Sequence, residues 1–246
     1  MLKKSCVVVV LSMLIGGSGW AADPKQPKYG PDAAPLSVSH EYFEKHTSPT
    51  FWSLIPYYIA QRDGRSCSLA SLTMIVNAVR GGVKLLASQP LVTQDHLMKK
   101  VDSKVWNRGL GLLGHGISLD QLGPLMEESF KAYDVKGVAV ETVHIPTFSP
   151  ESVQKLEKTL EEMEKTGKVW VVSNFLQSFY TGDAEIGHIS PIGAYDSAKK
   201  KVLVLDTDRE WYEPYWVSLD TFIRGMATKD SSASQNRGYL VIRSPL

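Results

Sequence analysis

The spacing of apolar residues predicts three helices in the first two thirds of the chain. The first begins at Ser66 and ends at Gly81-Gly82, with apolar residues at every third or fourth position. The second covers about Ser118–Ala132. The third begins at Ser149-Pro150, where a capping serine precedes a proline suited to the first turn, and it ends at Gly167.

After the third helix, the pattern changes to short β-rich segments bounded by turn residues. The expected strands are Lys168–Leu176, His188–Tyr195, Lys201–Asp206 and Gly238–Arg243. Helices followed by consecutive strands are typical of the α+β class, with the helices grouped to one side of an antiparallel sheet. No linker divides this part of the chain. We therefore expect a single domain over residues 49–246, preceded by an N-terminal arm over residues 22–48.

Residues 1–21 have the pattern of a secretory signal peptide. Lys3 and Lys4 precede an apolar run of ten residues, Cys6–Ile15, and small residues follow up to Ala21. That run is shorter than the roughly 20 residues that a membrane-spanning helix needs. We expect cleavage after Ala21, export to the periplasm or secretion, and no stable membrane insertion afterwards. An uncleaved anchor is the alternative.

Composition narrows the possible chemistry. Of 246 residues, 43% are hydrophobic and 22% are charged, a composition that excludes a disordered chain. The formal net charge is +1, so the chain has no overall positive charge that would favour non-specific binding of nucleic acid. The two cysteines, Cys6 and Cys67, are too few for a disulfide-dense scaffold or a four-thiolate zinc site. Signal removal would leave Cys67 alone. A lone thiol in an oxidising compartment is expected either to be buried or to have a functional role.

Cys67 lies where the first predicted helix begins. The unpaired N–H groups and the positive dipole end of a helix N-terminus favour a thiolate there. Gln61, six residues upstream, offers an amide that could donate to an oxyanion beside the N–H of Cys67. A free cysteine is also often only a small apolar residue, so Cys67 alone leaves both interpretations open.

A histidine and an aspartate follow in the order expected for a thiol enzyme. His188 opens one predicted strand and Asp206 ends the next, so an antiparallel hairpin could bring them together. The order Cys, His, Asp is that of papain-like enzymes. His115 is the rival base and Asp208 the rival acid. No metal-ligand spacing links the histidines to Cys67, so we expect no metal site and no tightly bound cofactor.

Three sequence blocks resemble those of a known family. The segment QRDGRSCSLASLTMIVNAV, Gln61–Val79, resembles the nucleophile segment of phytochelatin synthases, papain-like transferases that act on glutathione. The segment GHISPIGAYD, Gly187–Asp196, is similar to the histidine segment of that family, and Val202–Leu219 looks like its acid segment. The resemblance extends from about Thr50 to Arg243 and implies a papain-like fold, with the nucleophile helix packed on an antiparallel sheet.

The resemblance also implies a role for individual residues. It makes Cys67 the nucleophile, His188 the base and acid, Asp206 the residue that orients His188, and Gln61 part of the oxyanion hole. The resemblance also implies three substrate-binding residues. Asp230 and Arg237 match the residues that hold the γ-glutamyl end, and Arg209 matches a basic residue after the acid. A thiophilic metal such as cadmium or zinc would enter as a thiolate complex of glutathione. A homodimer is possible.

The sequence departs from the family pattern at three positions. Ser66 and Ser68 stand where the family has Tyr and Gly, and Trp211 replaces a basic residue, which affects acceptor binding more than acylation. The chain ends without the cysteine-rich C-terminal half of plant members, and this short form goes with prominent hydrolysis. We therefore expect cleavage of the Cys–Gly bond and resolution by water, giving γ-Glu-Cys, or by a second glutathione, giving a phytochelatin. The alternatives are a peptidase or amidase acting on other γ-glutamyl or cell-wall peptides, and a secreted metal-thiolate or peptide-binding protein without activity.

Overall fold

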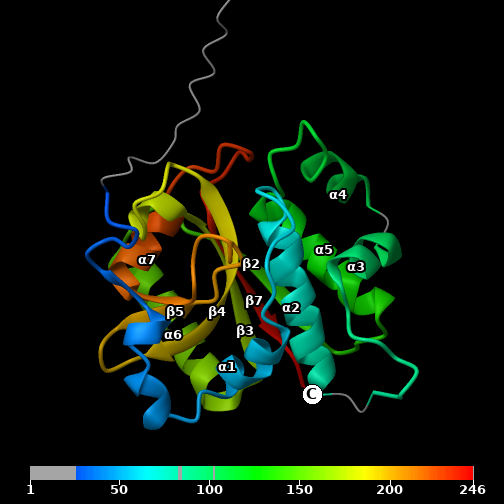
Figure 1. The fold of residues 1–246 in the computed structure, drawn as a ribbon, viewed down its shortest axis with the longest axis horizontal. Coiled ribbons are helices and arrows are strands. Elements are labelled where there is room, and N and C mark those ends of the chain that lie inside the picture. Colours follow the sequence, from blue (N-terminus) through cyan, green and yellow to red (C-terminus); the bar gives the residue numbers. More distant parts are fainter. Residues whose placement is uncertain (1–25, 83–84, 102, 246) are drawn as a thin grey trace, which may run out of the picture.

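An antiparallel sheet forms the centre of the computed structural model, which describes residues 26–82, 85–101 and 103–245 (Figure 1). Within these residues the sheet has seven strands in the order β1-β6-β5-β4-β3-β7-β2. Their bounds are β1 Ala33–Pro35, β2 Ala139–His144, β3 Val169–Leu176, β4 Gly187–Asp196, β5 Lys201–Val204, β6 Tyr215–Ser218 and β7 Gly238–Arg243. The predicted signal peptide and its cleavage site lie outside the described residues.

Helices cover both faces of the sheet. Their bounds are α1 Pro49–Leu54, α2 Cys67–Gly81, α3 Gln94–Lys100, α4 Lys104–Gly109, α5 Leu119–Ala132, α6 Pro150–Thr166 and α7 Leu219–Met226. Short 3₁₀ helices occupy Leu36–Val38, Glu41–Glu44, Ile55–Tyr57 and Gln177–Phe179. None of the helices in the described part of the chain is both long and apolar enough to cross a membrane.

The α+β class is confirmed, but the expected grouping of helices on one side was wrong. One apolar cluster joins α2 and α5 to one face of the sheet, and a second joins α6 and α7 to the opposite face. Figure 1 shows α6 and α7 on one side of the strands and α2 to α5 on the other. The reason lies in β3 and β4, which are buried along nearly their whole length and so need cover on both faces.

The three predicted helices and four predicted strands are present, with β5 ending two residues before Asp206. Gly167 ends α6 in the left-handed conformation, as a C-terminal glycine should. The sequence pattern missed β1, β2, β6 and the short helices. The edge strand β2 is mostly exposed, so it lacks the apolar alternation that identifies a strand.

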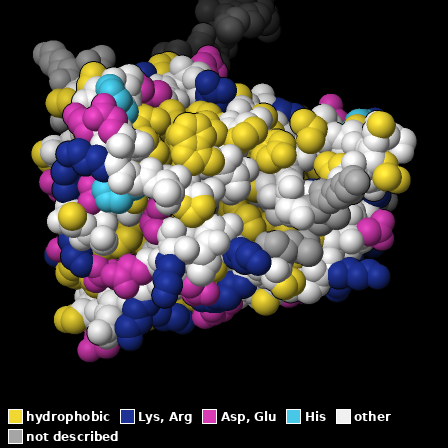
Figure 2. Space-filling model, turned by 90° about the horizontal axis from the view of Figure 1, so that it is seen from below, with side chains coloured by type: hydrophobic (Ala, Val, Ile, Leu, Met, Phe, Trp, Pro, Cys, Tyr) yellow, Lys and Arg dark blue, Asp and Glu magenta, His cyan; other side chains and the backbone are white. Residues whose placement is uncertain are grey.

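The described part of the predicted N-terminal arm packs against the domain. β1 pairs with β6 at the edge of the sheet, and the hydroxyl of Tyr42 donates a hydrogen bond to the Tyr195 carbonyl at 2.9 Å. On the face shown in Figure 2, basic and acidic side chains are interspersed around a band of apolar ones. This mixture agrees with the near-zero net charge of the chain.

Candidate active site

Cys67 is the first residue of α2, and the turn before it is closed by Ser66. The Ser66 hydroxyl accepts from the backbone N–H groups of Arg62 and Asp63, at 2.9 Å each, and forms no cap to the helix. The first N–H groups of α2 therefore have no side-chain cap, and their partial positive charge surrounds the half-buried thiol.

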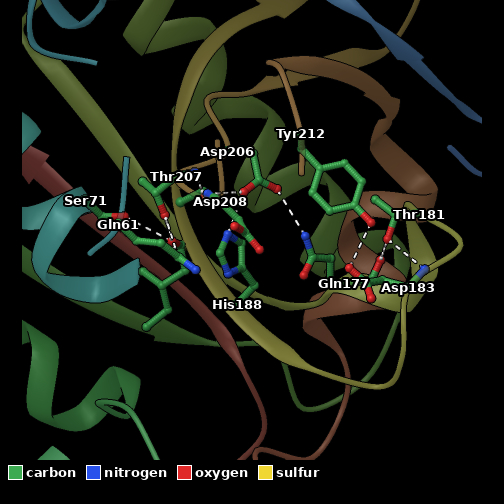
Figure 3. Close-up of polar contacts among 12 residues, drawn as sticks. Gln61, Ser71, Gln177, Thr181, Asp183, His188, Asp206, Thr207, Asp208 and Tyr212 are labelled. Atoms are coloured by element: carbon green, nitrogen blue, oxygen red, sulfur yellow. Dashed lines mark hydrogen bonds and ion pairs between the residues drawn. The ribbon is translucent and has the colours of Figure 1, made fainter. Parts of the chain in front are cut away.

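The start of β4 and the segment after β5 bring His188 and Asp206 into contact (Figure 3). His188 Nε2 lies 2.7 Å from Asp206 Oδ1, and the two residues are 4% and 0% exposed. The other carboxylate oxygen accepts from Tyr215 at 2.9 Å and from Gln177 at 3.4 Å. The rival acid Asp208 instead donates its backbone N–H to Asp206 at 2.9 Å, so it is Asp206 that faces the imidazole.

The charges of this pair stabilise each other in the interior. Burial lowers the pKa of His188, but the Asp206 carboxylate and, to a smaller extent, the neighbouring Cys67 thiol raise it, and the result lies well above the usual range. Burial raises the pKa of Asp206, yet His188 and the hydrogen bonds to the carboxylate leave it lowered. An imidazole that readily holds a proton beside a thiol is the arrangement that activates a cysteine nucleophile.

Gln61 lies beside the segment that carries Asp206. Its backbone N–H donates to the Thr207 carbonyl at 2.8 Å, and its side-chain oxygen accepts from the Thr207 hydroxyl at 3.5 Å. Figure 3 shows the Gln61 side chain next to the ring of His188. Because no hydrogen bond engages its amide nitrogen within the described residues, that donor is available to a ligand.

A pocket of about 330 Å³ contains Cys67. The helical side contributes Gly64, Arg65 and residues 114–117, and the sheet side contributes Asn174, residues 185–187, Ile189, residues 230–232 and Arg237. The sequence-predicted Asp230 and Arg237 are thus in the same pocket as the thiol. The rival histidine His115 also lines it, but makes no hydrogen bond or ion pair within the described residues.

Asp230 and Arg237 form a buried pair of opposite charges that do not bond each other. They are 5% and 4% exposed, and no ion pair joins them in the described chain. Asp230 accepts from Asn174 at 3.0 Å and from Ser232, and Arg237 Nη1 donates to Thr228 at 3.0 Å. Arg237 Nε is buried without a partner among the described residues. These two buried residues therefore offer one anion and one cation to a ligand, and the less buried Arg65 and Glu185 also line the pocket.

Gly187 makes room for this cation. A Cβ at that position would lie 2.8 Å from Arg237 Nη2, closer than real contacts allow. Burial lowers the pKa of Arg237, while nearby Asp230 raises it.

Arg209 lies outside the residues that line the pocket. It is exposed, and its guanidinium lies 4.5 Å from the ring centroid of Tyr58, whose hydroxyl donates to the Asp206 carbonyl at 2.5 Å. The structure therefore does not bring Arg209 together with Asp230 and Arg237.

Sequence reasoning missed the residues that support the site. Asn174 and the adjacent Ser173 interrupt an otherwise apolar strand, and this signal could have identified Asn174. No local pattern marks Gln177 or Tyr215 as partners of Asp206. Within the described ranges, no group of three or more His, Cys, Asp or Glu side chains is placed to hold a metal ion.

Comparisons with known proteins place this geometry in context. The family described as Phytochelatin synthase matches residues 37–239. Glutathione gamma-glutamylcysteinyltransferase 1 of Lotus japonicus is 27% identical over 205 residues, which cover 83% of this chain and 38% of that protein. The protein of the same name from Arabidopsis thaliana is 25% identical over 214 residues, 85% of this chain and 40% of the relative. A Schizosaccharomyces pombe glutathione gamma-glutamylcysteinyltransferase is 39% identical over 62 residues, which cover 25% of this chain and 14% of that protein. The matched region spans less than half the length of these curated relatives.

Proposed function

Because the chain belongs to the phytochelatin synthase family, we propose that it is a glutathione γ-glutamylcysteinyltransferase with a papain-like fold and catalytic centre. One observation carries the proposal. A single pocket contains the Cys67 thiol, at a helix N-terminus, and the buried charges of Asp230 and Arg237, which do not bond each other. The hydrogen-bonded pair His188 and Asp206 acts on that thiol.

The charged pair suits the γ-glutamyl end of glutathione, which carries one ammonium and one carboxylate group. Asp230 would bind the ammonium group, and Arg237 would bind the carboxylate through its free donors. Because Cys67 lines the same pocket, this binding directs the Cys–Gly bond of the substrate toward the thiol.

In the acylation step, His188 takes the proton of Cys67 and the thiolate attacks the carbonyl carbon of the Cys–Gly bond. The N–H of Cys67 and the amide of Gln61 donate to the oxyanion that forms. The carbon–nitrogen bond then breaks, glycine leaves with the proton from His188, and γ-Glu-Cys remains as a thioester on Cys67.

In the second step, His188 removes a proton from the incoming nucleophile, which attacks the carbonyl carbon of the thioester. The carbon–sulfur bond breaks, and Cys67 leaves as a thiolate beside the protonated His188. Water gives γ-Glu-Cys, and the amine of a second glutathione gives a phytochelatin. Cadmium or zinc would take part as a thiolate complex of glutathione, that is, as substrate. The pattern of residues 1–21 supports the further proposal that the enzyme works after export, in the periplasm or outside the cell.

The test is incubation of the purified protein with glutathione, with and without cadmium, followed by mass spectrometry. We expect glycine release, which Cys67→Ala should reduce by several orders of magnitude. His188→Gln should reduce the rate by about 10³-fold or more. The control His40→Gln, at an exposed histidine outside the pocket, should leave the rate nearly unchanged. γ-Glu-Cys alone would identify a hydrolase, and longer γ-Glu-Cys chains a synthase. Glycine release that survives Cys67→Ala would refute the proposal.

A further inference from the structure

A second pocket, of about 450 Å³, lies at the opposite end of α2 from Cys67. Arg80 stands in the last turn of α2, Lys99 and Lys100 in the last turn of α3, and Tyr133 at the C-terminal cap of α5. Thirteen residues of helix separate Cys67 from Arg80, which corresponds to about 20 Å along the axis. This pocket is therefore distinct from the proposed catalytic site.

The lining of this pocket has an excess of positive charge. Arg80, Lys99 and Lys100 are basic, and Asp134 supplies the one carboxylate among the lining residues. None of the three basic side chains forms an ion pair within the described residues. Arg80 is only 5% exposed, and among the described residues its side chain donates one hydrogen bond, to the Pro90 carbonyl at 3.2 Å.

Tyr133 lines the pocket, and its hydroxyl has no hydrogen-bond partner among the described residues. Arg80 Cζ and Lys100 Nζ lie 5.1 and 4.4 Å from the ring centroid of Tyr133. Its hydroxyl is buried and makes no hydrogen bond in the described part of the chain. A buried donor without an acceptor costs free energy, so a ligand oxygen that accepts a hydrogen bond from this hydroxyl would be favoured.

Helix electrostatics explain only part of this arrangement. A cation in the last turn of a helix is favourable, which accounts for a basic residue at the end of α2 and of α3. It does not account for two features of the described residues: the Tyr133 hydroxyl has no hydrogen-bond partner among them, and the buried Arg80 has no carboxylate partner among them. Hydroxyl, guanidinium and ammonium groups are all donors, and together they suit the several acceptor oxygens of one anion.

We propose that this pocket binds a small anionic ligand through a phosphate or carboxylate group. The oxyanion accepts a hydrogen bond from the Tyr133 hydroxyl and is paired with Arg80 and Lys100. This inference is independent of the proposed function, because it involves none of the residues of the Cys67 pocket.

Pyrophosphate and citrate, titrated separately into the wild-type protein by isothermal calorimetry at physiological salt, test the proposal. We expect saturable 1:1 binding of at least one of these two anions. Binding of pyrophosphate would identify a phosphate site, and binding of citrate a carboxylate site. Tyr133→Phe keeps the ring and removes only the unpartnered hydroxyl, so it should fold normally and bind about tenfold more weakly. The double variant Lys99→Gln/Lys100→Gln should weaken binding at least as much. The matched control, Lys45→Gln/Lys199→Gln, changes two exposed lysines outside the pocket and should bind like wild type. Absence of saturable binding by both anions, unchanged affinity in Tyr133→Phe, or an equal loss in the control would overturn the proposal.

Discussion

Tyr215 binds the carboxylate oxygen of Asp206 that His188 does not contact, so removing its hydroxyl tests the catalytic pair without touching its members. The hydroxyl donates at 2.9 Å, and the other donor to that oxygen, Gln177, is 3.4 Å away. In Tyr215→Phe, the carboxylate therefore loses its one short hydrogen bond on this side. A hydrogen bond to a charged group contributes about 1.5–3 kcal/mol, and we expect the variant to lose an amount near the lower value because Gln177 can move closer.

The loss should depend on pH in a defined direction. The pKa of Asp206 is lowered in the folded protein, partly by Tyr215, so its contribution to stability is complete above the unfolded value of roughly 3.9 and is lost as the pH falls through the folded pKa. The pKa of His188 is raised, so its contribution is complete below roughly 6.5 and is lost as the pH rises through the folded pKa. The pair thus contributes fully between these two values. The difference between wild type and Tyr215→Phe should be constant above pH 4 and shrink at lower pH.

Urea unfolding followed by circular dichroism from pH 7 to pH 3 measures this difference. Tyr180→Phe is the matched control: its hydroxyl is equally buried but donates to the neutral Phe222 carbonyl, at 2.6 Å. That variant should lose about 1 kcal/mol at every pH, because no ionisation changes its acceptor. If Tyr215→Phe also lost a pH-independent amount, or lost nothing, the proposed support of Asp206 would be wrong.

Four further substitutions test the substrate pocket and the nucleophile helix. Arg237→Lys keeps the charge but loses the planar donor set, so the KM for glutathione should rise about tenfold with little change in kcat, measured by glycine release. The ring of His144 is hydrogen-bonded to Asp120 on α5 and, at 2.7 Å, to the carbonyl of Asn236, the residue before Arg237. His144→Gln should therefore shift Arg237 and raise the KM for glutathione about threefold. A change in kcat alone would contradict this positioning role. The Ser68 hydroxyl is buried without a hydrogen-bond partner in the part of the chain that the structure describes, whereas Ser71 on the same helix donates to a β4 carbonyl at 3.0 Å. Urea unfolding should therefore show Ser68→Ala to be neutral or stabilising and Ser71→Ala to cost about 1 kcal/mol.

The candidate catalytic residues were recognisable in the sequence because each stands at a local boundary. Cys67 begins a periodic apolar segment, His188 opens an apolar strand, and Asp206 ends another. Such boundaries depend on neighbouring residues alone, so the pattern of a single chain predicts them. The helix caps at Ser149 and Gly167 are of the same kind, and α6 lies between them as expected.

The misses concern contacts between distant segments. The position of α6 and α7 on the second face of the sheet depends on the burial of β3 and β4 from both sides, and no local signal reports it. Asn174 and Gln177 support the site across 56 and 29 residues of sequence, respectively.

The sequence by itself determined the class of fold, the long helices and central strands, and the order of a thiol, an imidazole and a carboxylate along the chain. These features follow from periodicity and from residue types at element ends, which are properties of short segments. Only the tertiary structure decided that Asp206, and not Asp208, bonds His188, that Asp230 and Arg237 share the pocket of Cys67, and that Arg209 does not. Those outcomes depend on strand register and on packing between segments far apart in sequence, where differences of a few ångströms separate a contact from a near neighbour.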